Sequence, residues 1–78
     1  MNIKILGTGC INCKNLEKAV NITMAEMNLE AKVEKVEDIQ KIIGYGIMRT
    51  PGLVINEKVV SSGRVLSVSE LKEIFLKY

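Results

Sequence analysis

The feature that most restricts the fold is a pair of cysteines, Cys10 and Cys13, placed between two contrasting patterns. Before the pair, the short run 2–6 (NIKIL) is apolar and rich in β-branched residues, which predicts a strand. After it, apolar residues recur at helical spacing, which predicts an amphipathic helix from Cys10 or Ile11 to Met27. The two cysteines are therefore expected at a strand-to-helix turn.

The middle of the chain predicts a second strand, a short helix and a hairpin. The run 31–36 alternates apolar residues with Lys and Glu, a pattern that suits an edge strand because charges discourage edge-to-edge pairing. Asp38 can cap a short helix that ends at two nearby glycines. The apolar runs on either side of Asn56 and Glu57 predict an antiparallel hairpin with a tight turn.

The last segment carries a complete signal for the start of a helix. Ser67 is the expected cap, and Glu70, three residues on, completes a capping box. The residues expected on the buried face of this helix are Leu71, Ile74, Phe75 and Tyr78. The predicted order is strand, helix, strand, helix, strand, strand, helix, with the first two strands parallel and joined by a right-handed crossover. This is an α/β fold with a single domain over residues 1–78.

Composition and charge exclude several functions. The 11 Lys and Arg are interleaved with 9 Asp and Glu, and a net charge of +2 with one Phe and two Tyr gives no support for nucleic-acid binding. No apolar run is long enough to span a membrane and no signal peptide is visible, so a cytoplasmic chain is expected. A permanent structural disulfide is not expected in that reducing compartment. The absence of His rules out Cys–His and Ser–His–Asp catalysis and Cys₂His₂ zinc binding within one chain.

A Cys-x-x-Cys pair at the start of a helix favours redox chemistry. The free amide groups and the dipole of the helix stabilise a thiolate on the first cysteine, and in such motifs the cysteine pKa falls from about 8.5 to between about 3.5 and 7.5. The thiolate is the species that attacks a disulfide. Cys13 lies one helical turn after Cys10, where it can attack the mixed disulfide and release the reduced substrate.

Metal binding is the main competing interpretation. Two thiolates can hold Cu(I), and small copper-transfer domains also carry Cys-x-x-Cys between a first strand and a first helix. Those domains run strand, helix, strand, strand, helix, strand, whereas this chain has an additional helical segment after the second strand and ends in a capped helix. The order of the elements therefore favours the redox interpretation over a copper or zinc carrier.

The whole chain resembles the thioredoxin superfamily, and within it the small redox-active disulfide proteins of archaea and some bacteria. The resemblance rests on GTGCINCKNLEKAV, on VEKVEDIQKIIGYGIMRTPGLVINEKVVSSGRV and on the closing SEL helix. It implies a thioredoxin-like fold, β-α-β-α-β-β-α, in which a four-stranded mixed sheet carries helices on both faces.

The resemblance also implies a substrate-binding surface. Thr50 and Pro51 are expected to form a cis peptide bond that faces the cysteines, with the backbone before the proline pairing with the substrate chain and the proline keeping metal from the dithiol. Ile11 and Asn12, which stand between the cysteines, are the other expected substrate contacts. The pair lacks the preceding Trp and the internal Gly-Pro or Pro-Tyr of thioredoxin proper and of typical glutaredoxins.

Two further signatures of the superfamily are missing. The first strand carries no acidic residue beneath the cysteines, where thioredoxin proper has a carboxylate that relays protons. Glu17 and Asp38 are possible substitutes, although a surface helix position and a helix cap are the simpler interpretations of these two residues. The Gly-Gly-Asp step of the glutathione site is replaced by SGRVLSVSE, which argues against glutathione as the direct reductant.

The predicted function is that of a thiol–disulfide oxidoreductase in which Cys10 attacks and Cys13 resolves. No metal and no cofactor beyond the redox-active Cys10–Cys13 disulfide is expected. The expected partners are disulfide-containing protein substrates and a thioredoxin-reductase-like flavoenzyme or another thiol system, with the chain acting as a monomer. A metal carrier and a non-catalytic interaction module with a redox switch remain as alternatives at this point.

Overall fold

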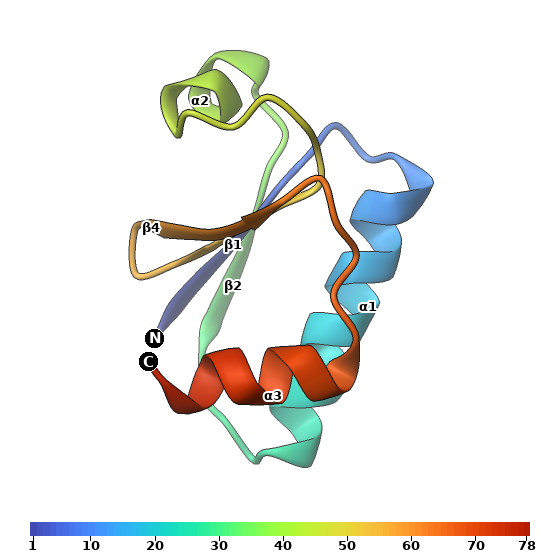
Figure 1. Cartoon of the computed structure of the whole chain (residues 1–78), viewed down its shortest axis with the longest axis vertical. Helices are drawn as coiled ribbons and strands as arrows, with labels where there is room; N and C mark the ends of the chain where they lie inside the picture. The colour runs from blue at the N-terminus through green and yellow to red at the C-terminus, as the bar shows by residue number, and fades with distance from the viewer.

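The computed structural model describes all residues, 1–78. Its elements follow the predicted order (Figure 1). They are β1 (Asn2–Leu6), α1 (Ile11–Glu26), β2 (Lys32–Val36), α2 (Ile39–Gly44), β3 (Gly52–Ile55), β4 (Lys58–Ser62) and α3 (Val68–Leu76). None of the three helices has the length and apolar character needed to cross a membrane.

The four strands form one mixed sheet in the order β2-β1-β3-β4. β1 pairs with β2 in parallel and with β3 in antiparallel orientation, and β3 pairs with β4 in antiparallel orientation. The charged strand β2 lies at one edge of the sheet, where its alternating Lys and Glu residues were expected. The predicted four-stranded α/β architecture is confirmed.

Helices cover both faces of this sheet. On one face, side chains of β1 and β3 pack with those of α1 and α3 and with Leu66 into a cluster of nine buried residues, and the two helices lie close together (Figure 1). On the other face, Leu6 and Val54 pack against Ile42 of α2 and against Ile47. Side chains of a strand point alternately to opposite faces, which is why Ile5 and its neighbour Leu6 join different clusters.

The turns and helix caps follow the local sequence signals. Asn56 and Glu57 both have positive φ, 50° and 67°, as a tight two-residue hairpin requires. Asp38 caps α2, since its Oδ1 accepts a hydrogen bond of 2.9 Å from the Gln40 N–H. The predicted capping box of α3 is also present.

The end of α3 differs from the prediction. Leu71 and Phe75 are buried and Ile74 is partly buried, but Tyr78 is 45% exposed and lies beyond the last helical residue. The helix ends at Leu76, two residues before Tyr78, so Tyr78 does not continue the buried face of the helix. Its assignment to the buried face was wrong.

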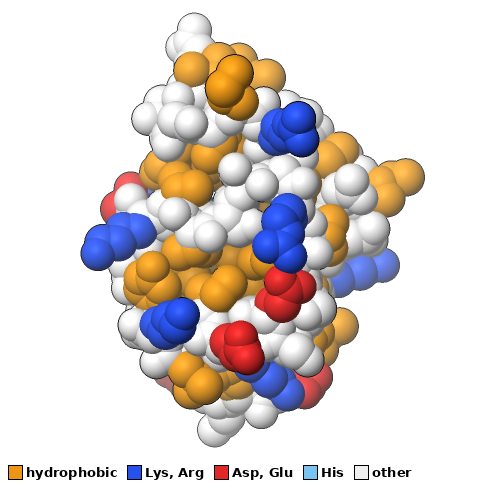
Figure 2. All heavy atoms as spheres, in the orientation of Figure 1, with side chains coloured by type: hydrophobic (Ala, Val, Ile, Leu, Met, Phe, Trp, Pro, Cys, Tyr) orange, Lys and Arg blue, Asp and Glu red, His pale blue; other side chains and the backbone are white.

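A polar network that the sequence patterns did not indicate joins the sheet to α2. Lys4 Nζ, on the α2 side of β1, donates to Tyr45 Oη at 3.0 Å and pairs with Glu57 in the hairpin turn. Tyr45 Oη in turn donates to Glu57 Oε2 at 3.1 Å. The hydrogen bond from Lys4 lowers the pKa of Glu57, and the same contact raises the pKa of Lys4 above its usual range. On the face of the molecule shown in Figure 2, acidic, basic and apolar side chains are mixed.

Candidate active site

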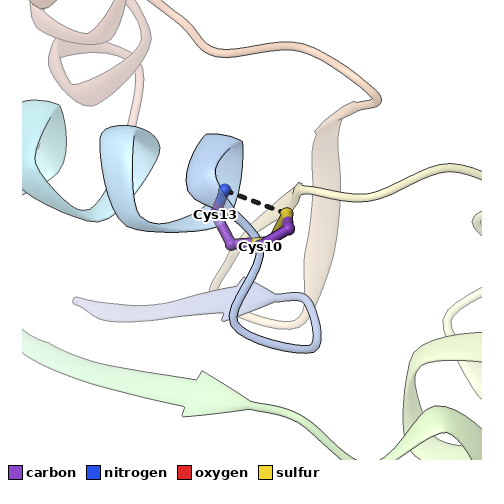
Figure 3. The surroundings of a disulfide bond; sticks show 2 residues. All are labelled: Cys10 and Cys13. Carbon is purple, nitrogen blue, oxygen red and sulfur yellow. Dashed lines mark hydrogen bonds between the residues drawn. A yellow bond between two sulfur atoms is a disulfide. The ribbon is translucent and has the colours of Figure 1, made fainter.

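Cys10 and Cys13 lie at the N-terminal end of α1 and are joined by a disulfide bond (Figure 3). Cys10 is the N-cap residue of the helix, and its Sγ accepts a hydrogen bond of 3.2 Å from the backbone N–H of Cys13. A sulfur atom therefore occupies the position that Ser, Thr, Asp or Asn usually fills at a helix start. The predicted strand-to-helix placement of the pair is what the structure shows.

The two sulfur-bearing residues differ sharply in exposure. Cys10 is exposed, whereas only 6% of Cys13 is accessible to solvent. Ile11 and Asn12 complete the first turn and are also exposed, Ile11 to 76%. The geometry thus presents one sulfur to an incoming molecule and keeps the other beneath it.

The electrostatic surroundings of Cys10 favour negative charge on its sulfur. The first turn of α1 contains no acidic residue, so nothing competes with the sulfur for the free amide groups at this helix end. The positive end of the helix dipole also favours negative charge on this sulfur, and Lys14 adds an exposed cation in the same turn. A thiolate on Cys10 would receive the Cys13 N–H as a direct donor.

Gly7 provides the space that the Cys13 sulfur occupies. A Cβ atom built at Gly7 would overlap Cys13 Sγ, and it would lie 3.9 Å from Cβ of Thr50. The φ of Gly7 is not positive, whereas Gly9, with a φ of 84°, adopts the left-handed conformation in the turn. No local sequence pattern indicates that the backbone at Gly7 must lie this close to the Cys13 sulfur.

Thr50 and Pro51 lie close to Gly7 and to the Cys13 side chain, because a Cβ atom built at Gly7 would approach both Cys13 Sγ and Cβ of Thr50. Their peptide bond is cis in the structure. Pro51 is buried, and its carbonyl accepts a hydrogen bond of 2.8 Å from the Gly63 N–H, while Thr50 is exposed. The loop is thus fixed through its proline and presents its threonine to solvent on the side of the cysteines.

A pocket of about 300 Å³ opens beside the buried cysteine. The residues that line it are Ile5, Gly7, Gly9, Cys13, Lys14, Glu17, Lys35 and Glu37. Glu17 of α1 and Lys35 of β2 form an ion pair of 3.0 Å at this pocket. Asp38, the other carboxylate considered from sequence, instead caps α2.

The donor set available for a metal ion is small. The structure contains no group of three or more Cys, Asp, Glu or His side chains arranged around a common point. The thiol ligands that the chain could offer a soft cation are Cys10 and Cys13, which are bonded to each other here. The element order is also the one expected for the redox interpretation, with α2 between β2 and β3 and α3 at the end.

Comparison with known proteins points to one family. A family model described as a thioredoxin domain matches residues 1–76. A thioredoxin from Methanothermobacter thermautotrophicus is 38% identical over 74 residues, which cover 95% of this chain and 96% of the relative. A thioredoxin from Methanocaldococcus jannaschii is 33% identical over 76 residues, which cover 97% of this chain and 87% of the relative. With its Cys-x-x-Cys pair at the start of α1, the chain belongs to the thioredoxin family and is a thiol–disulfide oxidoreductase.

Proposed function

We propose that this protein reduces disulfide bonds in protein substrates, with Cys10 as the attacking and Cys13 as the resolving residue. The observation that carries this proposal is the position of the Cys10 sulfur, which is exposed at a helix N-terminus and accepts the Cys13 N–H. A thiolate in that position is stabilised by the helix and is accessible to a substrate.

The first step forms a mixed disulfide. The Cys10 thiolate attacks one sulfur of the substrate disulfide, the substrate S–S bond breaks, and the other substrate sulfur leaves as a thiolate that takes a proton from water. The exposure of Cys10 and of the neighbouring Ile11 and Asn12 lets a protein surface approach.

The second step returns the protein to the disulfide state. Cys13 loses its proton and attacks Cys10 Sγ, the mixed disulfide breaks, and the second substrate sulfur leaves and is protonated. Two electrons have then passed from the dithiol to the substrate. In the closed pair the Cα atoms of the two cysteines lie 5.1 Å apart, within the range usual for a disulfide.

The proposed substrate contacts are Ile11, Asn12, Thr50 and Pro51. Ile11 offers an exposed apolar side chain beside the attacking sulfur, and Thr50 is exposed and lies close to Gly7, which the Cys13 sulfur also approaches. Pro51 is buried and would hold this segment in place. The role of the loop rests on the family resemblance together with this proximity.

The oxidised pair must be reduced again after each turnover. A reductase or a low-molecular-weight thiol system is the proposed electron source, and a flavoenzyme of the thioredoxin-reductase type is one form that it could take. The proposed setting is the cytoplasm, where such systems keep thiols reduced, and the proposed active form is a monomer.

Reduction of insulin in the presence of dithiothreitol tests the proposal. The wild-type protein should accelerate precipitation of the insulin B chain above the rate with reagent alone. In a separate incubation without dithiothreitol, reduced Cys13→Ser should accumulate a covalent complex with insulin that added reductant dissolves. Met27→Leu, a change in a partly buried side chain packed against the main core cluster, serves as the control and should retain activity. A wild-type rate equal to that of the reagent, with no trapped complex, would contradict the proposal.

A further inference from the structure

The surface around the exposed Cys10 sulfur is formed by three segments that meet at one end of the sheet. They are the start of α1, the loop before β3 and the loop after β4, which come together in the upper part of Figure 1. The Gly63 N–H donates to the Pro51 carbonyl at 2.8 Å, and a Cβ atom built at Gly7 would lie 3.9 Å from Cβ of Thr50. A substrate disulfide that reaches Cys10 therefore also lies beside these two loops.

The side chain of Arg49 lies along Gly63, which determines where its charge is held. A Cβ atom built at Gly63 would lie 3.0 Å from Cβ, 3.7 Å from Cγ and 3.3 Å from Cδ of Arg49, so the aliphatic part of the arginine runs across the glycine. Gly63 has a φ of 71°, a conformation that favours glycine, and it has no side chain that would displace the arginine. Arg49 thus joins the loop before β3 to the loop after β4 while remaining exposed.

No carboxylate of the chain pairs with Arg49. It takes part in none of the ion pairs of the molecule. The other arginine nearby, Arg64, is held by Glu70 at 2.8 Å. On the cysteine side, Lys14 lines a pocket that Glu37 also lines, so positive and negative charges are both present there. Arg49 is therefore the uncompensated cation on the loop side of the site.

An exposed guanidinium without a partner suits a carboxylate. Arginine presents its donors in a planar fork that matches the two carboxylate oxygens, whereas lysine acts as a point charge. Arg49 directly precedes Thr50, the proposed contact for the substrate backbone. An extended chain advances about 3.3–3.6 Å per residue, so substrate residues within two positions of the reactive cysteine lie about 7 Å or less from it along the chain. A carboxylate at these positions can meet the arginine.

We propose that Arg49 gives this protein a preference for disulfides flanked by acidic residues, because its guanidinium pairs with a carboxylate next to the reactive substrate cysteine. The inference rests on the proposed function, since it concerns which disulfides the dithiol reduces. Arg49 takes no part in bond making: Cys10 and Cys13 still supply the two electrons. Because the pair forms at an exposed position, the expected gain is several-fold rather than many orders of magnitude.

Three disulfide peptides of otherwise identical sequence test this preference. Two strands, one with a fluorophore and one with a quencher, are joined by a disulfide, so reduction separates them and restores fluorescence. The residues that flank both cysteines are Glu, Gln or Lys. Each peptide is mixed with the reduced protein without any other thiol, which gives a second-order rate constant. Flanking charge also changes the reactivity of the peptide cysteines themselves, so each rate is divided by that of dithiothreitol with the same peptide.

We expect the wild-type protein to reduce the Glu peptide about three- to fivefold faster than the Gln peptide, and the Lys peptide more slowly than either, at about 0.01 M salt. At about 1 M salt the three normalised rates should converge, because the screening length falls from about 30 Å to about 3 Å. This salt dependence separates charge pairing from apolar contacts with the same peptides.

Three substitutions at position 49 test whether the arginine is the cause. Arg49→Gln should bring the normalised rates with the three peptides within about twofold of one another. Arg49→Lys, which keeps the charge, should retain part of the preference. Arg49→Glu should reverse the order, so that the Lys peptide becomes the fastest. A reversed order also shows that the variant is folded and reactive.

Lys58→Gln is the matched control. Lys58 is also an exposed cation that forms no ion pair, but it pairs with Ile55 at the opposite end of β3 from Pro51. Its removal lowers the net charge by the same amount as Arg49→Gln. The control should keep the wild-type preference, which would exclude net charge as the cause.

Equal normalised rates of the wild type with the Glu and Lys peptides, or a preference that persists in Arg49→Gln, would overturn the inference. Failure of the proposed function would give a different result, because the wild type would then reduce neither insulin nor any of the three peptides.

Discussion

The first backbone N–H groups of a helix have no partner within the helix, and the N-termini of α1 and α3 satisfy them with different side chains. At α3, Ser67 Oγ accepts the Glu70 N–H, and Glu70 Oε1 accepts the Ser67 N–H, both at 3.2 Å. At α1, Cys10 Sγ accepts the Cys13 N–H at the same distance, but the first turn has no acidic residue. At the start of α3, the side chains of Ser67 and Glu70 thus accept hydrogen bonds from backbone N–H groups. At the start of α1, the acceptor is a cysteine sulfur and no carboxylate is present.

This difference separates stability from reactivity. A capping box satisfies two backbone donors and stabilises the helix whether or not anything binds there. A cysteine cap satisfies one donor less strongly, because sulfur is a weak acceptor, but its thiolate form gains from the same donor and dipole. Loss of the Cys10 cap should therefore change activity, whereas loss of the Ser67 cap should change stability.

The largest effect is expected from Cys10→Ser. Serine is a good N-cap residue, so the helix start should persist and the free energy of unfolding should stay within about 1 kcal/mol of that of the reduced wild type. Insulin reduction should fall to the rate of the reagent alone, because the attacking sulfur is gone. Residual turnover well above that rate would show that Cys10 is not the attacking residue.

Gly7→Ala should produce the next largest effect, on stability. The new Cβ would overlap Cys13 Sγ, and such overpacking typically costs about 1–3 kcal/mol. Urea unfolding of the oxidised protein measures the loss. Gly44→Ala is the control, since no atom lies within 4 Å of a Cβ built there, and it should leave stability unchanged or raise it by up to about 1 kcal/mol. Equal stability of the two variants would contradict the packing argument.

Ser67→Ala should break the α3 cap while leaving the chemistry intact. Loss of an N-cap side chain typically costs about 1 kcal/mol of unfolding free energy. Insulin reduction, measured well below the unfolding temperature, should remain within twofold of the wild-type rate. A large drop in activity without unfolding would mean that the α3 end contributes to the active site.

The smallest effect is a pH dependence at the same cap. The backbone N–H of Ser67 lowers the pKa of Glu70, with further help from the Ser67 side chain and Arg64. A lowered pKa in the folded state means that the contribution to stability is present above the unfolded pKa and is lost as pH falls through the folded value. Glu70→Gln should therefore be less stable than the wild type near pH 7, and the difference should shrink as the pH falls below the ordinary pKa of a glutamate. A difference that stays constant over this range would contradict the assignment.

Elements of this fold that depend on neighbouring residues could be read from the sequence. The capping box of Ser67 and Glu70, the Asp38 cap and the Asn56–Glu57 turn each use residues within three positions of one another. The order of elements followed from these signals and from apolar periodicity. The prediction for Tyr78 was wrong because the apolar periodicity of the sequence continues past Leu76, where α3 ends.

Features that depend on tertiary packing were not visible in the sequence. Glu17 fits a surface helix position, and only the arrangement of α1 beside β2 reveals its pairing with Lys35 next to Cys13. The requirement for a glycine at position 7 depends on where the Cys13 sulfur lies in space. The cysteine pair itself was evident, because its spacing and its place at a helix start are local properties.

The most direct test compares the two helix ends as sites for a thiol. Cys10 in the Cys13→Ser variant is measured against the thiol created by Ser67→Cys in a Cys10→Ser, Cys13→Ser background, using the rate of alkylation by iodoacetamide. Both positions are exposed N-caps, but Glu70 faces only the second. At about pH 6, where an ordinary thiol is almost fully protonated, we expect Cys10 to react about tenfold faster. Rates equal within about twofold, or a faster reaction at the α3 position, would contradict the claim that the α1 end activates its sulfur.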